Sequence, residues 1–437
     1  GLIGFHLIMF ANRIHTHLMP TDLFVRRPLL WLQLAAKVRA SILCSPNFGY
    51  RHYLKVLGER ALTDVDLASV RLIFNGAEPI SVELCDEFLT RLAPAGLRRE
   101  AMFPVYGLAE ASLAVSFPPP ETLYHALSFD RHRLSLNQPA VIVAPDSQDA
   151  LQLVSVGRAI PYCALRIADD ADQPLSEQRV GHIHIHGENV TRGYFEDAET
   201  DAATFSSDGW LRTGDLGLIH EGELYITGRH KEILFVNGQN YYPHDLERIA
   251  EAVPGLELGK VVIAGARPRG SETELLLVFV LHRGEISDFV PLARQLARVL
   301  GEQAGLQPDA VVPVRRIPKT TSGKVQRHLL EQEYLAGAFD TALAELQRLG
   351  GATTTAADRG GAIEQQLRTI CETELDGRSI DVDESLFDLG ASSLKLIAIH
   401  ERIERLWPGL VEVTDIFEHP SIAALSAFIE SKAIATP

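Results

Sequence analysis

Residues 228–247 read GRHKEILFVNGQNYYPHDLE, and the hydrophobic pattern of the chain changes on either side of this stretch. The residues before it, 151–227, are rich in the short apolar runs of β-strands and end in LRTGDLG (211–217) and GELYITGR (222–229). The Asp of the first motif and the Arg of the second could both hydrogen-bond a ribose diol. Each alone is more often a turn residue or half of a surface ion pair.

Further upstream, apolar runs at 42–44 and 70–74 alternate with helical periodicity at 82–92. This alternation predicts βα units. The pattern changes at about 118–155, where PPP is followed by short alternating pieces, and we expect an insertion of turns and strands there. We therefore predict an α/β domain with a small β subdomain over 1–230.

Downstream, apolar runs predict strands at 260–264 and 274–281, and amphipathic patterns predict helices at 245–252 and 290–300. These elements predict a small α+β domain over 231–345.

A segment rich in Gly, Thr and Ala follows, GGATTTAADRGG (350–361), and we assign 346–361 to a flexible linker. Beyond it the pattern is helical only, and the prediction for 362–437 is a small four-helix bundle. The apolar residues with helical spacing are Ile363, Leu367, Ile370, Cys371, Leu375, Leu396, Ile399, Ile403, Leu406, Ile422, Leu425 and Ile429.

The composition is that of an ordinary globular protein, with 46% hydrophobic residues, 22% charged residues and a net charge of −16. This charge argues against binding nucleic acid through its phosphates. Residues 362–437 hold 14 Asp/Glu and 6 Lys/Arg, or −8 of the −16. Such a module could dock on basic surfaces, or its surface could simply be soluble.

The four cysteines are scattered without a CxxC pair, which argues against zinc and disulfides and fits a reducing, cytoplasmic compartment. The opening GLIGFHLIMF is apolar but too short to span a membrane. It has no initiator Met and resembles the middle of a buried segment, so we expect the chain to begin inside a domain.

Three further motifs can carry chemistry. PKTTSGKVQR (318–327) places Lys324 in a polar, flexible loop that could bring a cation to a carboxylate and a phosphate; a solvated surface lysine is the alternative. In NGAEP (75–79), Gly76 and Ala77 would let a planar ligand approach the backbone, although a strand-ending turn is the alternative. In YGLAE (106–110), an aromatic ring could stack on a base, and a carboxylate four residues later could hold Mg²⁺ with its waters.

Together and in this order, NGAEP, YGLAE, TGD, GRxKE and PKTTSGK resemble the adenylate-forming superfamily, which includes acyl-CoA synthetases, peptide-synthetase adenylation domains and luciferases. The resemblance covers about residues 1–345. It implies an ATP-dependent ligase that forms AMP and pyrophosphate with the help of Mg²⁺.

The roles that this resemblance implies fall into four groups. For binding ATP and the adenylate it implies Gly76, Ala77, Glu78 and Pro79 along one edge of adenine, Tyr106 stacked on it with Gly107 and Ala109 beside it, and Asp215 and Arg229 at the ribose hydroxyls. Glu110 would be the catalytic carboxylate on the magnesium side. Lys324 would bridge the substrate carboxylate and the α-phosphate, and Lys231 would be the hinge of the small domain.

Three details resemble the fatty acyl-AMP ligases within this superfamily. Ala109 stands where CoA-forming relatives usually carry Thr. The segment 118–155 occupies the place of an insertion that is thought to restrict the small domain. The opening stretch, 228–247, is similar to the GRxKxxIIxxGxNxYPxDIE pattern of these ligases. The resemblance therefore implies a fatty acid as the substrate.

The stretch SLFDLGASSLKL (385–396) resembles the attachment motif of acyl and peptidyl carrier proteins. It implies 4′-phosphopantetheine on Ser393, with Ser392 as a candidate N-cap. TDIFEHPSIAAL (414–425) is similar to the last two helices of such carriers; an ordinary capped helix is the alternative. The implied partners are a phosphopantetheinyl transferase and a downstream domain or module of a polyketide or peptide synthase.

The chain departs from the superfamily pattern in one respect, because no Ser/Thr/Gly-rich phosphate loop ending in Pro-Lys-Gly is found in 1–437. We therefore expect it to be the C-terminal part of a larger enzyme. Two other functions stay open: an acyl- or aryl-CoA synthetase that releases free thioester, and an inactive fragment that acts only as a carrier or docking module.

GHIHIHG (181–187) places His182, His184 and His186 on one face of a predicted strand. Three histidines could ligate zinc. Strand neighbours at i and i+2 separate along the sheet, however, so we do not expect these three to share one ion.

Overall fold

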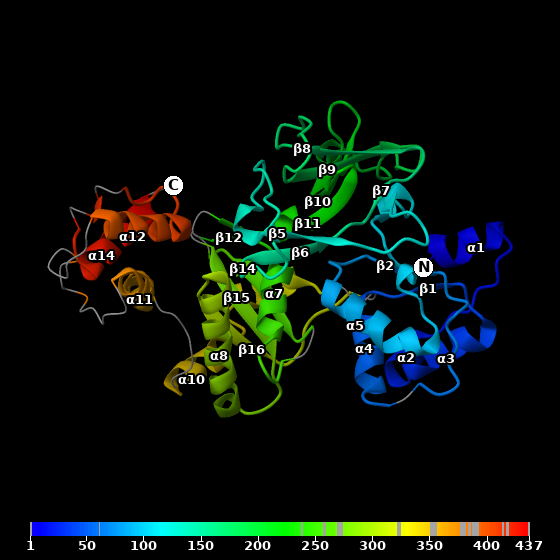
Figure 1. Ribbon diagram of the computed structural model, residues 1–437, viewed down its shortest axis with the longest axis horizontal. Coiled ribbons are helices and arrows are strands. Elements are labelled where there is room, and N and C mark those ends of the chain that lie inside the picture. Colours follow the sequence, from blue (N-terminus) through cyan, green and yellow to red (C-terminus); the bar gives the residue numbers. More distant parts are fainter. Residues whose placement is uncertain are drawn as a thin grey trace. The chain divides into compact units, whose positions relative to one another are not determined.

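The computed structural model describes most of the chain (Figure 1). The chain divides into two compact units. The described residues are 2–60, 62–236, 239–256, 259–268, 274–320, 325–349, 356–375, 382, 386, 393–412, 415–416 and 419–435. Unit 1 consists of Gly1–Ile233, Asn240–Arg248 and Glu257–Gly259, and unit 2 of Leu234–Gln239, Ile249–Leu256 and Lys260–Pro437. Residues 240–248, which the sequence pattern assigns to the small domain, therefore belong to unit 1.

Unit 1 begins with helices and a three-stranded parallel sheet in the order β1-β2-β3. Its first elements are η1 (Leu2–Leu7), α1 (Ile8–Ala11), α2 (Thr21–Arg26), α3 (Leu29–Val38), β1 (Ile42–Cys44), α4 (Asn47–Leu57), β2 (Leu72–Asn75), α5 (Val82–Leu92), η2 (Ala93–Ala95), η3 (Arg99–Ala101) and β3 (Met102–Pro104). β1 and α5 have the bounds expected from the sequence, and β2 begins two residues after its apolar run does. The predicted βα pattern is confirmed.

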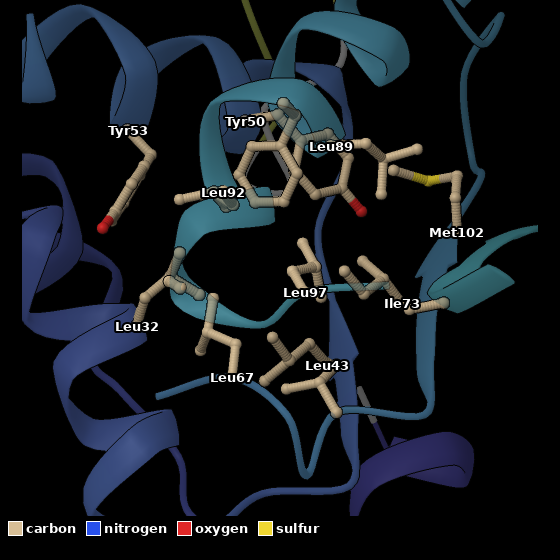
Figure 2. Packing of buried hydrophobic residues seen from close by; sticks show 14 of the residues in the cluster. Leu32, Leu43, Tyr50, Tyr53, Leu67, Ile73, Leu89, Leu92, Leu97 and Met102 are labelled. Carbon is tan, nitrogen blue, oxygen red and sulfur yellow. The ribbon is translucent and has the colours of Figure 1, made fainter. Parts of the chain in front are cut away.

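Residues of α3, α4 and α5 form one hydrophobic core with the parallel strands (Figure 2). Phe88 of α5 is fully buried, and its ring centroid lies 4.8 Å from that of Tyr50 and 6.2 Å from those of Trp31 and Tyr53. The hydroxyl of Tyr50 donates to the carbonyl oxygen of Phe74 at 3.2 Å, so the polar end of this buried ring is satisfied. This packing fixes β2, whose end carries the motif NGAEP.

The second part of unit 1 contains a four-stranded antiparallel sheet in the order β11-β10-β9-β8. Its elements are β8 (Cys163–Ala168), β9 (Gly181–Gly187), α6 (Ala198–Thr204), β10 (Leu211–His220), β11 (Glu223–Arg229) and η6 (His230–Glu232). Ile183 and Ile185 of β9 lie in a hydrophobic core with Leu211 and Leu224. Because side chains alternate along a strand, the histidines of β9 lie on its other face.

The segment expected to be an insertion, 118–155, contains turns and short strands. The elements in this region are η4 (Ala109–Ala111), β4 (Ser116–Phe117), β5 (Ala126–Asp130), η5 (Arg131–Arg133), β6 (Ala150–Val154) and β7 (Arg158–Ala159). β5 pairs with β6 in an antiparallel register, and β4 pairs with β7. Phe129, Leu151 and Leu153 of this hairpin are buried together with Tyr225 of β11, so the hairpin packs against the antiparallel sheet.

Unit 2 contains a small sheet in the order β14-β15-β16, in which β15 is antiparallel to β14 and parallel to β16. Its elements are β14 (Val261–Ala266), β15 (Leu275–Leu281), α8 (Ile286–Ala304), β16 (Ala310–Val314), α9 (Arg327–Leu335) and α10 (Asp340–Arg348). The sequence alternates between the two units over residues 234–256. This segment contains three short elements, β12 (Leu234–Val236), β13 (Gln239–Tyr241) and α7 (Pro243–Glu251). The predicted α+β pattern is confirmed.

The last part of the chain is helical, as expected, with α11 (Ala356–Glu374), α12 (Ser393–Leu406) and α14 (Ile422–Ala435). The apolar residues with helical spacing form one core, in which Ile363 and Leu406 are partly buried and the others are buried. Two parts of the expected linker are helical: residues 346–348 end α10, and residues 356–361 begin α11. A fourth helix is not among the described elements. Within the described ranges, every helix is too short or too polar to cross a membrane.

Candidate functional site

The two residues predicted to bind a ribose face each other at one end of the antiparallel sheet. Asp215 of β10 is the cross-strand partner of Arg229 of β11, and Arg229 Nε lies 2.9 Å from Asp215 Oδ1. The hydroxyl of Tyr106 donates to Asp215 Oδ2 at 2.7 Å. Three residues that the sequence predicts as nucleotide ligands therefore meet, although Tyr106 is 109 positions away from Asp215.

A local irregularity of β10 supports this arrangement. The pairing of β10 with β9 shifts between Arg212 and Leu216, and Gly214 lies within the shift with a φ of 76°, a conformation that favours glycine. Thr213 Oγ1 donates to the carbonyl of Ile183 at 2.8 Å and accepts from the backbone N–H of Asp215 at 3.1 Å. The TGD motif is thus a bulge that directs the Asp215 carboxylate.

The three residues of this site differ in their exposure to solvent. Tyr106 is buried, and burial together with the neighbouring Asp215 carboxylate holds the pKa of its phenol well above the usual value. The side chain of Asp215 is only 11% exposed, whereas that of Arg229 is 57% exposed. Arg229 is therefore the member of the group that solvent reaches, and its donors can turn towards a polyol or a phosphate.

The NGAEP turn is held by packing at the end of β2. A Cβ atom on Gly76 would lie 2.6 Å from the carbonyl oxygen of Val105. The backbone directly after β3 therefore packs closely against Gly76. Ala77 has a φ of 70°, and Asn47 Nδ2 donates to the carbonyl of Pro79 at 2.6 Å. The structure gives Gly76 a packing role here, and the close approach of a ligand to this turn stays a prediction.

Glu110 lies in η4, and its carboxylate is fixed by a residue that the sequence pattern does not reveal. The hydroxyl of Tyr194 donates to Glu110 Oε1 at 2.8 Å, and this hydrogen bond raises the pKa of Tyr194. The backbone N–H of Thr191 donates to the carbonyl of Glu110 at 2.7 Å. An anchored, half-buried carboxylate suits Mg²⁺, which binds hard oxygen ligands and retains waters. Nothing in the sequence near Tyr194 signals this contact.

The other predicted residues are placed less completely. Lys231 is exposed in η6, two residues after the site residue Arg229. Helix α12 begins at Ser393, and its first turn has no acidic residue, so its backbone N–H groups and dipole suit a phosphate ester. The side chain of Ser393 and all of Ser392 and Lys324 lie outside the described residues.

A second carboxylate–arginine contact was not anticipated from the sequence. Arg131 of η5 donates to Asp245 Oδ2 at 2.5 Å and to the carbonyl of Ala150 at 3.1 Å. Both charged side chains are almost fully buried, with 6% and 5% exposed. Arg248 adds an ion pair with Glu83 of α5. These contacts hold residues 240–248 to the hairpin and to α5, all within unit 1.

The histidines of β9 do not converge on one another. His182 Nε2 lies 3.0 Å from Asp170 Oδ1, and the His186 ring lies 5.7 Å from that of Trp210. His184 is buried, and burial lowers its pKa to about 4. The three residues have separate surroundings, as strand geometry predicts.

Comparison with known proteins identifies two parts of the chain. Residues 1–195 match the family model described as AMP-binding enzyme, and residues 365–429 match the model described as phosphopantetheine attachment site. A putative acyl-CoA synthetase of Caulobacter vibrioides is 35% identical over 341 residues, which are 78% of this chain and 59% of that protein. A medium-chain-fatty-acid–[acyl-carrier-protein] ligase, TtuA, of Teredinibacter turnerae is 31% identical over 361 residues, which are 77% of this chain and 55% of the ligase.

Among solved structures, one from studies of fatty acyl-adenylate ligases of E. coli and L. pneumophila superposes with a TM-score of 0.71. It is 32% identical, and the match covers 78% of this chain and 61% of the other. The chain thus spans less than two thirds of the length of each of these proteins. The chain therefore contains a region similar to AMP-binding enzymes and, in the same polypeptide, a phosphopantetheine attachment domain.

Proposed function

We propose that the protein activates a fatty acid as its acyl-adenylate and transfers the acyl group to the phosphopantetheine thiol of its own carrier domain. The observation that carries the proposal is the meeting of Tyr106, Asp215 and Arg229 in one group, in a chain that also contains an attachment domain. A tethered carrier supplies a thiol acceptor at high effective concentration. The protein would then be a loading unit of a polyketide or peptide synthase.

The reaction has two balanced steps. In the first, a carboxylate oxygen of the fatty acid attacks the α-phosphorus of ATP and pyrophosphate leaves. In the second, the carrier thiol loses its proton and attacks the acyl carbonyl, and AMP leaves with the electron pair of the broken anhydride bond. Each step builds negative charge on oxygen, which positively charged donors stabilise.

Individual residues have distinct tasks in this proposal. Arg229 and Asp215 bind the ribose hydroxyls, because one offers donors and the other offers acceptors. Tyr106 presents its ring to adenine while its hydroxyl holds Asp215. Lys324 places a cation between the carboxylate and the α-phosphate. Glu110 would hold Mg²⁺, which supplies charge neutralisation at the phosphates.

The domain limits expected from the sequence, 1–230, 231–345, 346–361 and 362–437, are also part of the proposal, with residues 240–248 contributing contacts to unit 1. Lys231 would act as the hinge that lets the small domain serve both steps. Its place two residues after the end of β11 supports this role, because that strand is fixed by pairing and the side chain of Lys231 is exposed.

Intact mass of the chain tests the proposal. The chain is treated with a phosphopantetheinyl transferase and CoA, and then with ATP, Mg²⁺ and a mixture of fatty acids. We expect a mass increase for the arm on this chain, and a second increase for the acyl group on the complete gene product, which would supply the phosphate loop not found in 1–437. Ser393→Ala should remove both increases, whereas Lys324→Ala should keep the first and lose the second. Lys319→Ala, in the same loop, is the matched control and should keep both.

The same assay on the complete gene product separates the alternatives. If neither the chain nor the complete product gains an acyl group or releases pyrophosphate, the ligase proposal is wrong and the protein is a carrier or docking module. If Ser393→Ala is still loaded, the attachment site is misassigned. These two failures are independent of each other.

A second candidate function is an acyl-CoA synthetase, which the name of the Caulobacter relative favours. With free CoA in place of the transferase reaction, such an enzyme would release acyl-CoA. Absence of acyl-CoA together with loading of the carrier would favour the ligase. A phosphopantetheinyl transferase and a downstream synthase module are the proposed partners, and the cytoplasm is the proposed location.

A further inference from the structure

One group of side chains outside the nucleotide site has the composition of a metal centre. Asp170, His182 and His230 each offer one ligand atom, and these atoms lie within 4.8 Å of one another. We propose that these three residues bind a divalent transition-metal ion of the zinc class. All three belong to unit 1, so the site is contained in one compact body.

Strand pairing brings the three segments together. β9 lies between β8 and β10, and His182 is the cross-strand partner of Ala168 on one side and of Leu216 on the other. Asp170 follows Ala168 by two residues, and His230 begins η6 directly after β11. The ring of His182 lies 4.8 Å from that of His230, with the planes at 70°.

The donor set and its spacing suit zinc. Two imidazole nitrogens and one carboxylate oxygen form a common three-ligand zinc set, which leaves a fourth position for water. With bonds of about 2.1 Å, tetrahedral ligand atoms are about 3.4 Å apart. The Asp170 and His182 ligand atoms, at 3.0 Å, are already close to that spacing. His230 is exposed, and a shift of its ring on the order of 1.5 Å would complete the set.

The carboxylate is oriented by an outer hydrogen bond of the kind that accompanies metal ligands. Asn137 Nδ2 donates to Asp170 Oδ2 at 3.1 Å, while the other oxygen, Oδ1, is the one next to His182. Asn137 is itself fixed, because its backbone N–H donates to the carbonyl of Val180 at 2.8 Å. The insertion thus contributes to the support of the site.

The other two histidines of β9 show that the convergence of ligand atoms is a property of Asp170, His182 and His230, and not of the strand. His184 is 1% exposed and has no hydrogen-bond partner at either ring nitrogen, and Asp172, its nearest carboxylate, is already paired with Arg212. The His186 ring lies 5.7 Å from that of Trp210 instead, with the two planes tilted by 45°. Neither residue belongs to the group of converging ligands found among the described residues.

An occupied site would tie η6 to β9. Lys231, the proposed hinge, directly follows His230, so a bound ion would restrain the hinge segment. That consequence rests on the proposed function, whereas metal binding itself does not. Binding to the folded state alone also raises thermal stability by mass action.

Calorimetric titration of the full, metal-stripped chain with ZnCl₂ at pH 7.5 tests the proposal. We expect the wild-type chain to bind one more equivalent of zinc than the triple variant Asp170→Asn/His182→Gln/His230→Gln, and His230→Gln alone to weaken that equivalent at least tenfold. The double variant His186→Gln/His220→Gln is the matched control and should bind as the wild type does. Circular dichroism confirms that each variant is folded.

Two further readouts keep the test decisive. Zinc should raise the melting temperature of the wild-type chain and of the control more than that of His230→Gln, an exposed change that leaves the sheet intact. Co²⁺ should give visible d–d bands with the wild type that His230→Gln loses. Equal zinc stoichiometry and affinity in the wild type and the triple variant would overturn the proposal.

Discussion

Two carboxylate–arginine pairs of unit 1 have the same chemistry and opposite surroundings. Asp245 and Arg131 expose 5% and 6% of their side chains, whereas Arg229 exposes 57% beside an Asp215 that exposes 11%. Burial raises the pKa of Asp245, and the neighbouring Arg131 opposes that effect. The buried pair Arg131–Asp245, called the closed pair below, holds the insertion to residues 240–248. The pair Arg229–Asp215, called the open pair below, keeps the guanidinium of Arg229 available to a ligand.

The difference in burial indicates which of the two pairs stabilises the fold and which can bind a ligand. Removing charges from water costs free energy that their mutual attraction offsets only with good geometry, so a buried pair resists loss of one partner. A pair with one exposed member contributes little to stability, because water screens it. The four predictions below test this contrast, from the largest expected effect to the smallest.

The closed pair should dominate stability. Arg131→Leu leaves the Asp245 carboxylate buried with only the longer contact to Arg248, at 3.4 Å. We expect the free energy of unfolding to fall by about 3–5 kcal/mol, measured by urea denaturation of the chain. The double variant Arg131→Leu/Asp245→Leu should recover most of this loss. A single variant as stable as the double would refute the role of the pair.

The open pair should dominate nucleotide use. Asp215→Asn keeps the shape of the side chain and removes its charge, so we expect ATP to bind about 10–100-fold more weakly, because hydrogen bonds to charged groups contribute about 1.5–3 kcal/mol. The measurement is the KM for ATP in pyrophosphate exchange by the complete gene product. Asp208→Asn, at an exposed carboxylate of the same unit, should leave that KM unchanged. An unchanged KM in Asp215→Asn would remove this residue from the site.

The hydroxyl of Tyr106 is buried and also holds the site residue Asp215, so its removal should have an intermediate effect on stability. Tyr106→Phe removes the donor to Asp215 Oδ2 in a buried position, and we expect the unfolding free energy to fall by about 1–2 kcal/mol. Tyr194→Phe removes a hydroxyl that is more exposed and should cost less than about 1 kcal/mol. Thermal denaturation of both variants compares them directly. Equal losses would mean that burial does not set the strength of the Tyr106 bond.

The smallest effect should be seen at a pair whose carboxylate is exposed while its arginine is largely buried. Arg166 lies 2.7 Å from Asp208, and its hydrogen bond lowers the pKa of that carboxyl from 3.8 to about 2. A carboxyl with a lowered pKa stabilises the fold above its unfolded value and loses that contribution as the pH falls towards 2. In Arg166→Gln the pKa of Asp208 should therefore rise towards 3.8. Carboxyl NMR titration measures it, and an unchanged value would assign the shift to Ser206 alone.

Sequence patterns predicted the elements better than the contacts between them. α5 and β1 have the expected bounds because their apolar residues recur with helical or strand period within one segment. The apolar positions expected in the last helices are the ones that form their shared core. Asp215 and Arg229 were predicted as a pair, and antiparallel pairing places them opposite each other.

Other features had no local signal. Tyr194 and Glu110 are 84 positions apart, and Arg131 and Asp245 are 114 apart. Helical patterning assigned residues 240–248 to the small domain, yet their buried contacts place them in unit 1. Periodicity describes which face of an element is apolar, but it does not state which other element that face will meet.

The sequence by itself determined the order of the nucleotide motifs, the helical periods of the last segment and the resemblance to adenylate-forming enzymes that these motifs carry. These follow from residues close in the chain, where backbone geometry fixes the spacing. Only the tertiary structure decided that His182 meets Asp170 and His230 and not the histidines beside it in β9. The physical reason is that neighbours in a strand separate along the sheet, while strand pairing brings distant segments within bonding distance.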